Sequence, residues 1–224
     1  MKKYKTISNV PDCKNAQGLW LKNYYTKGEE FYTTNITRAG ILWMTLTAKC
    51  KENGLVQVKY KTYQGCYNLF TDFQSFAEWC NNQPGYTNKE EKGFWSLDKD
   101  ILISGNKNYS EQNCCFVPNF INCLFSNHNT PENGSMQGVY FREKFNKFVS
   151  QCQNELGKRE HLGHFDNEFD AHRAWQVRKS EVLTNQAKTY ISMSGSREDV
   201  YKSIIQRANK IIEDHKNYYP TLNF

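Results

Sequence analysis

Polar and hydrophobic residues alternate along three short segments between residues 138 and 165, a pattern that predicts three β-strands. The segments read GVYFR, KFVSQCQ and KREHLGHF, and a turn at 154–157 separates the last two. A helix should follow, capped by Asp166 or Asn167, and its apolar residues could cover one face of the sheet: Phe169, Ala171, Ala174 and Trp175. The uncovered face would carry side chains that bond phosphates and base edges: Arg142, Gln151, Gln153, Arg159 and His161.

The rest of the chain mixes helical and extended patterns. Residues 19–25 and 29–36 could be strands, and helices are expected at 39–50 and 72–82. The pattern at 95–125 predicts a strand, a turn, a strand and a short helix, with the turn at 104–106 and the helix at 118–122. The helix after the sheet should continue to about residue 190. A further helix should occupy 199–215, with Ser196 and Asp199 as a capping pair. These elements predict an α+β fold.

Net charge and hydropathy bear on the partner and the cellular location that can be expected. Lys and Arg exceed Asp and Glu by six in 224 residues, which is compatible with a polyanionic partner but also with an ordinary basic protein. No apolar run reaches the roughly 20 residues needed to cross a bilayer, and the amino terminus lacks the apolar segment of a signal peptide. We therefore expect a cytoplasmic protein without a membrane partner.

Eight cysteines are present, and none forms a C-x-x-C pair. In a reducing cytosol they are most simply buried small hydrophobic residues. A zinc site built from Cys50, Cys66, Cys114 or Cys115 is conceivable, but the spacing does not favour one, so zinc is not expected.

The carboxyl-terminal pattern carries a specific resemblance. Four short motifs together resemble the DNA-binding domain of plant ethylene-response factors, the APETALA family. In chain order they are GV-x-x-R, K-F-V, LG-x-F-D and E-x-x-A-x-x-A-W. That family lays its three-stranded sheet in the major groove. The resemblance implies that seven residues meet DNA: Tyr140, Arg142, Lys144, Gln151, Gln153, Arg159 and His161. The plant proteins have arginine or tryptophan at several of these positions, and one residue is inserted here between Arg142 and Lys147. The fold and docking face should carry over, but the plant target sequence should not.

A second resemblance covers residues 41–125. The phrases L-D-K-D-I-L, GNK-x-x-S-x-x-N and C-F-V-P-x-x-I-N are similar to bacteriophage HNH-type homing endonucleases. This resemblance implies a ββα nuclease module that hydrolyses phosphodiester bonds in duplex DNA with a divalent ion, Mg²⁺ or Mn²⁺.

The usual HNH histidine is missing, because no histidine occurs between residues 1 and 127. Asp98, Lys99 and Asp100 stand in its place. Asp98 and Asp100 with Asn122 could hold the ion through oxygen atoms, and Lys99 could assist by charge or by accepting a proton. The catalytic set would be Asp98, Lys99, Asp100 and Asn122, with Asn106 orienting the turn. Alternatively, the D-K-D run is a solvated charged edge on a nuclease remnant.

Together these predictions divide the chain into an HNH-like nuclease region at 1–125, a linker at 126–137, an ethylene-response-factor-like DNA-binding domain at 138–180 and a C-terminal helical extension at 181–224. The expected protein is a site-specific, metal-dependent DNA endonuclease of phage or mobile-element type. It would act on double-stranded DNA as a monomer or homodimer in the cytoplasm of an infected bacterial host. The alternative is a DNA-binding regulator or accessory protein whose nuclease half is inactive. A third possibility is a protein that occupies a nucleic-acid-binding partner.

Overall fold

The computed structural model describes residues 4–27, 32–91, 93–125 and 136–222. The chain forms two compact units, one made of Met1–Thr87 with Leu97–Phe116, the other of Asn88–Ser96 with Val117–Phe224. Both contain helices and strands, so the predicted α+β class is confirmed. Most of the predicted linker at 126–137 lies outside the described residues, and the proposed division into functional domains stays a prediction. Among the described helices, none is both long and apolar enough to span a bilayer.

The first unit begins with a three-stranded sheet of order β1-β3-β2, made of β1 (Tyr4–Val10), β3 (Tyr32–Thr37) and β2 (Asn23–Lys27). β3 runs parallel to β1 and antiparallel to β2. β3 leads directly into α1 (Arg38–Cys50), whose cap is Thr37: its hydroxyl accepts a hydrogen bond from the Gly40 amide. The strands at 19–25 and 29–36 were thus predicted close to their observed places, whereas β1 was not predicted.

An aromatic cluster forms the core of this unit. α3 (Phe73–Asn81) begins at Asp72, which forms a reciprocal capping box with Ser75. The buried side of α3 packs its rings with those of neighbouring segments, in the set Phe70, Phe76, Trp79, Tyr86 and Phe116. This helix matches the predicted segment 72–82, because its apolar residues follow the 3.6-residue period that burial on one side requires.

Short elements follow in the chain. α2 (Leu55–Lys59) and a 3₁₀ turn (Lys61–Tyr63) precede β4 (Tyr67–Asn68), which pairs in parallel with β8 (Asn108–Tyr109). β7 (Ser96–Asp98) pairs with β9 (Cys115–Val117), and α4 (Asn119–Asn122) follows with Pro118 at its cap. The predicted order of strand, turn, strand and short helix at 95–125 is therefore present.

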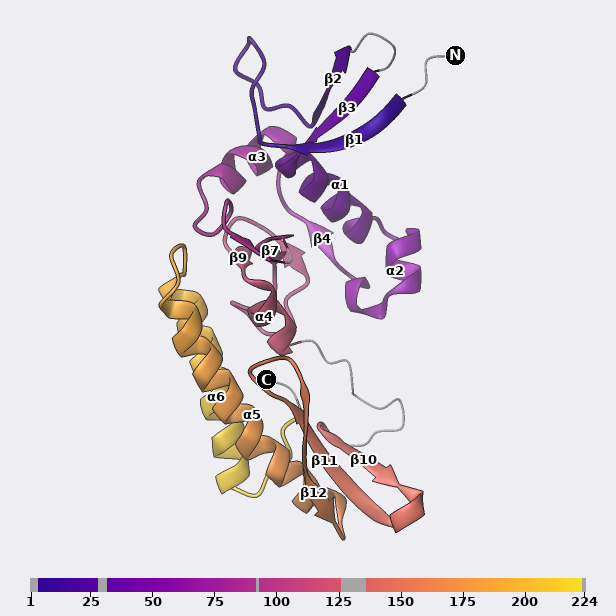
Figure 1. Cartoon of the computed structure of the whole chain (residues 1–224), viewed down its shortest axis with the longest axis vertical. Helices are drawn as coiled ribbons and strands as arrows, with labels where there is room; N and C mark the ends of the chain where they lie inside the picture. The colour runs from indigo at the N-terminus through magenta and orange to yellow at the C-terminus, as the bar shows by residue number, and fades with distance from the viewer. Residues whose placement is uncertain (1–3, 28–31, 92, 126–135, 223–224) are drawn as a thin grey trace. The chain divides into compact units, whose positions relative to one another are not determined.

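The second unit contains the predicted antiparallel sheet. β10 (Val139–Arg142), β11 (Lys147–Gln153) and β12 (Arg159–Phe165) pair in chain order. α5 (Glu168–Ile191) follows at once, and Asn167 caps it by accepting a 2.8 Å hydrogen bond from the Asp170 amide. α5 packs on the sheet at its amino-terminal end and runs alongside α6 (Glu198–Lys216) for much of its length (Figure 1). A short hairpin of β5 (Lys89–Glu90) and β6 (Gly93–Phe94) also belongs to this unit.

The start of α6 differs from the prediction. Its cap is Arg197, and no side chain caps the helix. The Ser196 hydroxyl instead donates to the Ile191 carbonyl at the end of α5, while the Asp199 carboxylate binds the Arg197 guanidinium. The predicted Ser196–Asp199 pair is therefore wrong, because both side chains have stronger local partners.

A buried histidine fastens the end of the chain to α5. His172 Nδ1 lies 2.9 Å from the Gln137 carbonyl oxygen, and the Thr221 amide donates to His172 Nε2 at 3.0 Å. The ring is fully buried and stacks on Trp175, with centroids 5.2 Å apart. Because Nε2 accepts a hydrogen bond, the ring is neutral with its proton on Nδ1. Burial lowers the pKa of His172 below its usual value.

This arrangement makes stability depend on pH. The unfolded chain binds a proton at His172 more readily than the folded chain does, so folding should be favoured above about pH 6.5 and weakened as the pH falls below it. We expect the contribution of His172 to the free energy of unfolding to fall between about pH 7.5 and about pH 5, so that the His172→Gln variant is less stable than the wild type at the higher pH and closer to it at the lower pH. Denaturant titrations at three pH values test this. An unchanged pH slope in the variant would contradict it.

Candidate functional site

The strand register gathers most of the residues expected to meet DNA on one face of the β10–β12 sheet. Directly opposed residues share a face, and side chains alternate along each strand. The opposed sets on this face, called the open face below, are Tyr140–Val149–His164, Arg142–Lys147, Gln151–His161 and Gln153–Arg159. Tyr140, Arg142, Gln153, Arg159 and His161 are exposed, whereas Gln151 is half-buried. Six of the seven expected residues therefore lie together.

The opposite face is covered by α5. Val139, Ser150 and Cys152 are buried there, and Cys152 packs in one cluster with Trp175 and Val182. The helix thereby fixes the strands from behind without reaching the open face. A sheet held in this way presents its polar side chains on a rigid support.

One irregularity decides which residues of β12 are exposed. Ser150 pairs with Gly163, but the next residue, Gln151, pairs with His161, so Leu162 is an extra residue in β12. Leu162 packs into the cluster beneath the sheet. Gly163 adopts φ +139°, which favours glycine. Strict alternation would put His161 and His164 on opposite faces, and the bulge puts both on the open face.

The seventh expected residue, Lys144, lies in a 3₁₀ turn (Glu143–Phe145) between β10 and β11 rather than on a strand. The ring of Phe145 is the centre of this turn. The Arg142 guanidinium lies 4.8 Å from its centroid, the Lys144 ammonium 5.6 Å, and the His164 ring 5.8 Å edge-on. Phe145 is 47% exposed. Phe145 and His164 were not predicted as members of this surface, although an aromatic residue between Lys144 and Lys147 was a usable signal.

Positive charge dominates the open face and the adjoining turn. Lys147 forms an ion pair with Asp166, but among the described residues no carboxylate forms one with Arg142 or Arg159. The side chain of Gln153 already makes one hydrogen bond, in which its amide donates to the Gly157 carbonyl at 2.8 Å. Arg142 and Arg159 are thus the groups best placed to bind an external anion.

The predicted catalytic loop has its own geometry in the first unit. Asp98 Oδ1 accepts hydrogen bonds from the amides of Asp100 at 2.9 Å and Ile101 at 2.7 Å, so this carboxylate holds the turn that follows β7. Burial, with Asp100 nearby, raises the pKa of Asp98 to about 6. Asn106 orients the loop as expected: its amide donates to the carbonyls of Lys99 at 2.6 Å and Asn108 at 2.8 Å.

Lys99 is not part of a solvated edge. Its side chain is 7% exposed, and its ammonium lies 2.8 Å from Asp100 Oδ2. Only Asp100 in the D-K-D run is widely exposed, so the alternative interpretation of a solvated charged run does not describe Asp98 or Lys99.

The carboxylates expected to hold Mg²⁺ or Mn²⁺ already make other bonds in the structure. One oxygen of Asp98 is used by two amides, one oxygen of Asp100 is used by an ammonium group, and Asn122 belongs to the other unit. No group of three or more His, Cys, Asp or Glu in the described ranges could hold a metal.

Comparisons of the chain with family models, curated proteins and solved structures gave no match. The two resemblances seen in the sequence therefore remain resemblances.

Substitutions of Asp98 can separate the effect of its acceptor oxygen from the effect of its charge. Asp98→Asn keeps an oxygen for the two amides and removes the charge, whereas Asp98→Ala removes both. Since the folded pKa is raised, ionisation of Asp98 costs stability as the pH rises from about 4 through about 6. We expect the Asp98→Asn variant to match or exceed the wild type in stability at about pH 8, with a smaller difference at about pH 4. The Asp98→Ala variant should lose about 1–2 kcal/mol at about pH 4, and less at about pH 8, where it also removes the cost of the charge.

Denaturant titrations of the wild type and the two variants at these two pH values measure the differences. Equal losses in the Asn and Ala variants at the higher pH would show that the charge itself holds the turn.

Proposed function

We propose that this protein binds double-stranded DNA through the open face of the β10–β12 sheet. One observation carries the proposal: the register and the bulge bring Arg142, Gln151 and Arg159, with His161, to the same side of a sheet that a helix supports from behind. Arginine pairs with the major-groove edge of guanine and glutamine with that of adenine. A β-ribbon or small sheet is narrow enough to enter the major groove.

The chemistry of the rim supports the same proposal. Lys144 and Lys147 lie beside Arg142, where cations can contact phosphates while the strands face the bases. The resemblance to ethylene-response-factor domains points to the same surface, and the chain's net charge of +6 fits a polyanionic partner. By the resemblance to phage endonucleases, the protein would act in the cytoplasm of an infected bacterial host, as a monomer or homodimer.

A second proposal is metal-dependent cleavage of the bound duplex. The pairing of β7 with β9, followed by α4, reproduces the ββα order that the resemblance to HNH-type homing endonucleases implies. The bonds that already engage one oxygen of Asp98 and one oxygen of Asp100 instead favour the rival, a DNA-binding regulator or accessory protein with an inactive nuclease half.

Arginine substitutions test the binding proposal. Arg142→Ala and Arg159→Ala should each weaken duplex binding and reduce the slope of log affinity against log salt by about 1 if the lost contact is to phosphate. A contact to guanine would instead cost about 1–3 kcal/mol and relax the choice of base at one position. Fluorescence anisotropy on a random-sequence duplex at several salt concentrations distinguishes the two.

Lys202→Ala is a suitable control, since Lys202 is an exposed cation of α6 with only an i,i+4 partner, Glu198. The binding proposal fails if both arginine variants behave like this control.

The cleavage proposal has a separate test. Wild-type protein should nick supercoiled plasmid when Mg²⁺ or Mn²⁺ is added, and Asp98→Asn and Asp100→Asn should abolish nicking while duplex affinity stays the same. Asp98→Asn is preferred to Asp98→Ala because it preserves the acceptor for the turn amides. Binding without cleavage by the wild type would favour the regulator, and full cleavage by both variants would remove these carboxylates from the reaction.

A further inference from the structure

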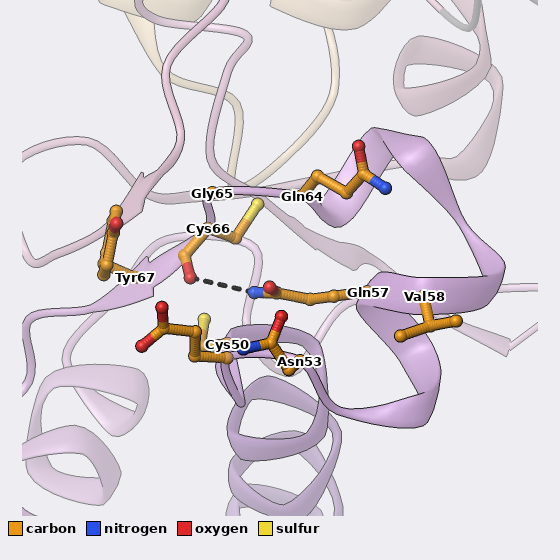
Figure 2. Close-up of a pocket in the computed structure, with 9 residues that line it drawn as sticks. Cys50, Asn53, Gln57, Val58, Gln64, Gly65, Cys66 and Tyr67 are labelled. Atoms are coloured by element: carbon orange, nitrogen blue, oxygen red, sulfur yellow. Dashed lines mark hydrogen bonds between the residues drawn. The ribbon is translucent and has the colours of Figure 1, made fainter.

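A pocket of about 280 Å³ lies in the first unit, and none of its lining residues belongs to the predicted catalytic loop (Figure 2). Its lining comes from the end of α1, from α2, and from the segment that leads into β4: Cys50, Glu52, Asn53, Gln57, Val58, Gln64, Gly65, Cys66 and Tyr67. The volume is just below the range of about 300–1,000 Å³ typical of small-molecule sites. A single planar ring system is therefore the size of ligand that it suits.

Two uncharged thiols and a hydrogen-bonded glutamine are among the groups that line the pocket. Burial raises the pKa of the Cys50 thiol to about 11, and burial also raises that of Cys66, so both thiols stay protonated at neutral pH. Gln57 is buried, and its amide donates to the carbonyls of Lys49 at 3.0 Å and Cys66 at 3.3 Å. These bonds tie α2 to the segment opposite, so the cavity is formed before any ligand enters.

The rim combines an aromatic ring with hydrogen-bonding groups. Tyr67 is 58% exposed and lies across the pocket from Val58 in Figure 2. The carboxylate of Glu52 can only accept hydrogen bonds at neutral pH, whereas the amides of Asn53 and Gln64 can donate and accept. This is the set of groups that recognises the edge of a nucleobase, while a tyrosine ring can stack on its face.

Lysines and tyrosines alternate in the segments next to the lining residues. The Lys49 ammonium lies 4.7 Å from the Tyr63 ring centroid, the Lys59 ammonium 5.2 Å from that of Tyr60, and Lys107 donates to the Thr62 carbonyl at 2.9 Å. Two further exposed cations, Lys51 and Lys61, flank the same segments. The lining itself contains one carboxylate, Glu52, and these five lysines belong to the segments next to it in the fold. Cations interleaved with aromatic rings are typical of surfaces that bind single strands.

We propose that this pocket receives one nucleobase of an unpaired nucleotide, with Tyr67 stacking on the base and the surrounding lysines contacting the phosphates. Only an unpaired base can enter a cavity of this size, because a base within a duplex is stacked on both sides and paired along its edge. The proposal goes beyond duplex binding by the open face and uses residues of the other unit alone.

A protein segment is the competing occupant, since Leu55 and Val58 are 89% and 68% exposed beside the pocket. The excess of lysine over carboxylate in these segments favours a polyanion instead. A pocket that binds a peptide in place of a nucleobase would contradict the proposal.

The test uses the full chain and a single strand of about 12 nucleotides of mixed sequence, within the site sizes typical of single-strand binding, in low salt. Fluorescence anisotropy should show binding that Tyr67→Ala weakens by on the order of 5- to 150-fold, as expected for loss of one base–aromatic stack. Tyr67→Phe should retain binding, because it keeps the stacking ring. Tyr25→Ala is the matched control: this tyrosine of β2 is 59% exposed, against 58% for Tyr67, and lies outside the pocket.

Photocrosslinking locates the bound base. A strand that carries 5-iodouracil should crosslink to the pocket segment, identified by mass spectrometry of the digested protein. Absence of single-strand binding, equal affinity of the Tyr67→Ala and Tyr25→Ala variants, or crosslinks confined to other segments would each overturn the proposal. A pocket that serves a peptide gives the first of these results.

The combined variant Arg142→Ala and Arg159→Ala separates this inference from the proposed function. Loss of duplex binding by this variant with an intact crosslink at the pocket is the expected result, and unchanged duplex binding with an intact crosslink would reject the open face alone. Loss of duplex binding by this variant, with no crosslink at the pocket in either the wild type or the variant, would reject the pocket alone.

Discussion

The packing of Trp175 against the backbone at Gly138 is the contact on which the second unit depends. A Cβ atom at Gly138 would lie 2.0 Å from Cδ1 of the indole ring, so only glycine allows the helix to approach the first strand this closely. The same ring touches Cys152 and Val182 in one cluster and stacks on His172. Trp175 thereby joins the strands, α5 and, through His172, the carboxyl-terminal residues.

This close approach explains why the open face can be polar. Burial of Val139, Ser150 and Cys152 under α5 stabilises the sheet from one side, and Val149 is the one buried residue in the opposed sets of the open face, so the rest of that face can be polar. Arg142 and Arg159 can then remain exposed at little cost to folding. The proposed DNA-binding surface is a consequence of how the helix packs, and no separate loop has to be ordered to form it.

The second unit could be predicted from sequence to a large extent, because alternation over five to seven residues and a capped amphipathic helix are strong local signals. The bulge at Leu162 could not, since it depends on which residue of β12 pairs with Gln151 across the sheet.

The first unit was harder to predict from sequence. α2 exposes Leu55 and Val58, so its apolar residues carry no periodic burial signal, and β1 was not recognised because its partner β3 lies more than 20 residues later. The role of the candidate catalytic residues could not be predicted either. The D-K-D run is equally compatible with metal binding and with turn formation, and hydrogen bonds from two backbone amides to Asp98 cannot be read from residue types. The pocket at Cys50 and Tyr67 also escaped prediction, because segments separated in sequence build it and none of them carries a recognisable motif.

The extra residue in β12 has a geometric effect beyond the direction of two histidines. A bulge increases the local right-handed twist of a strand pair. Twisted ribbons follow a spiral path, and the floor of a major groove is itself spiral. On the proposed function, Leu162 therefore affects the curvature match between protein and duplex, and with it the number of consecutive base pairs that the strands can reach.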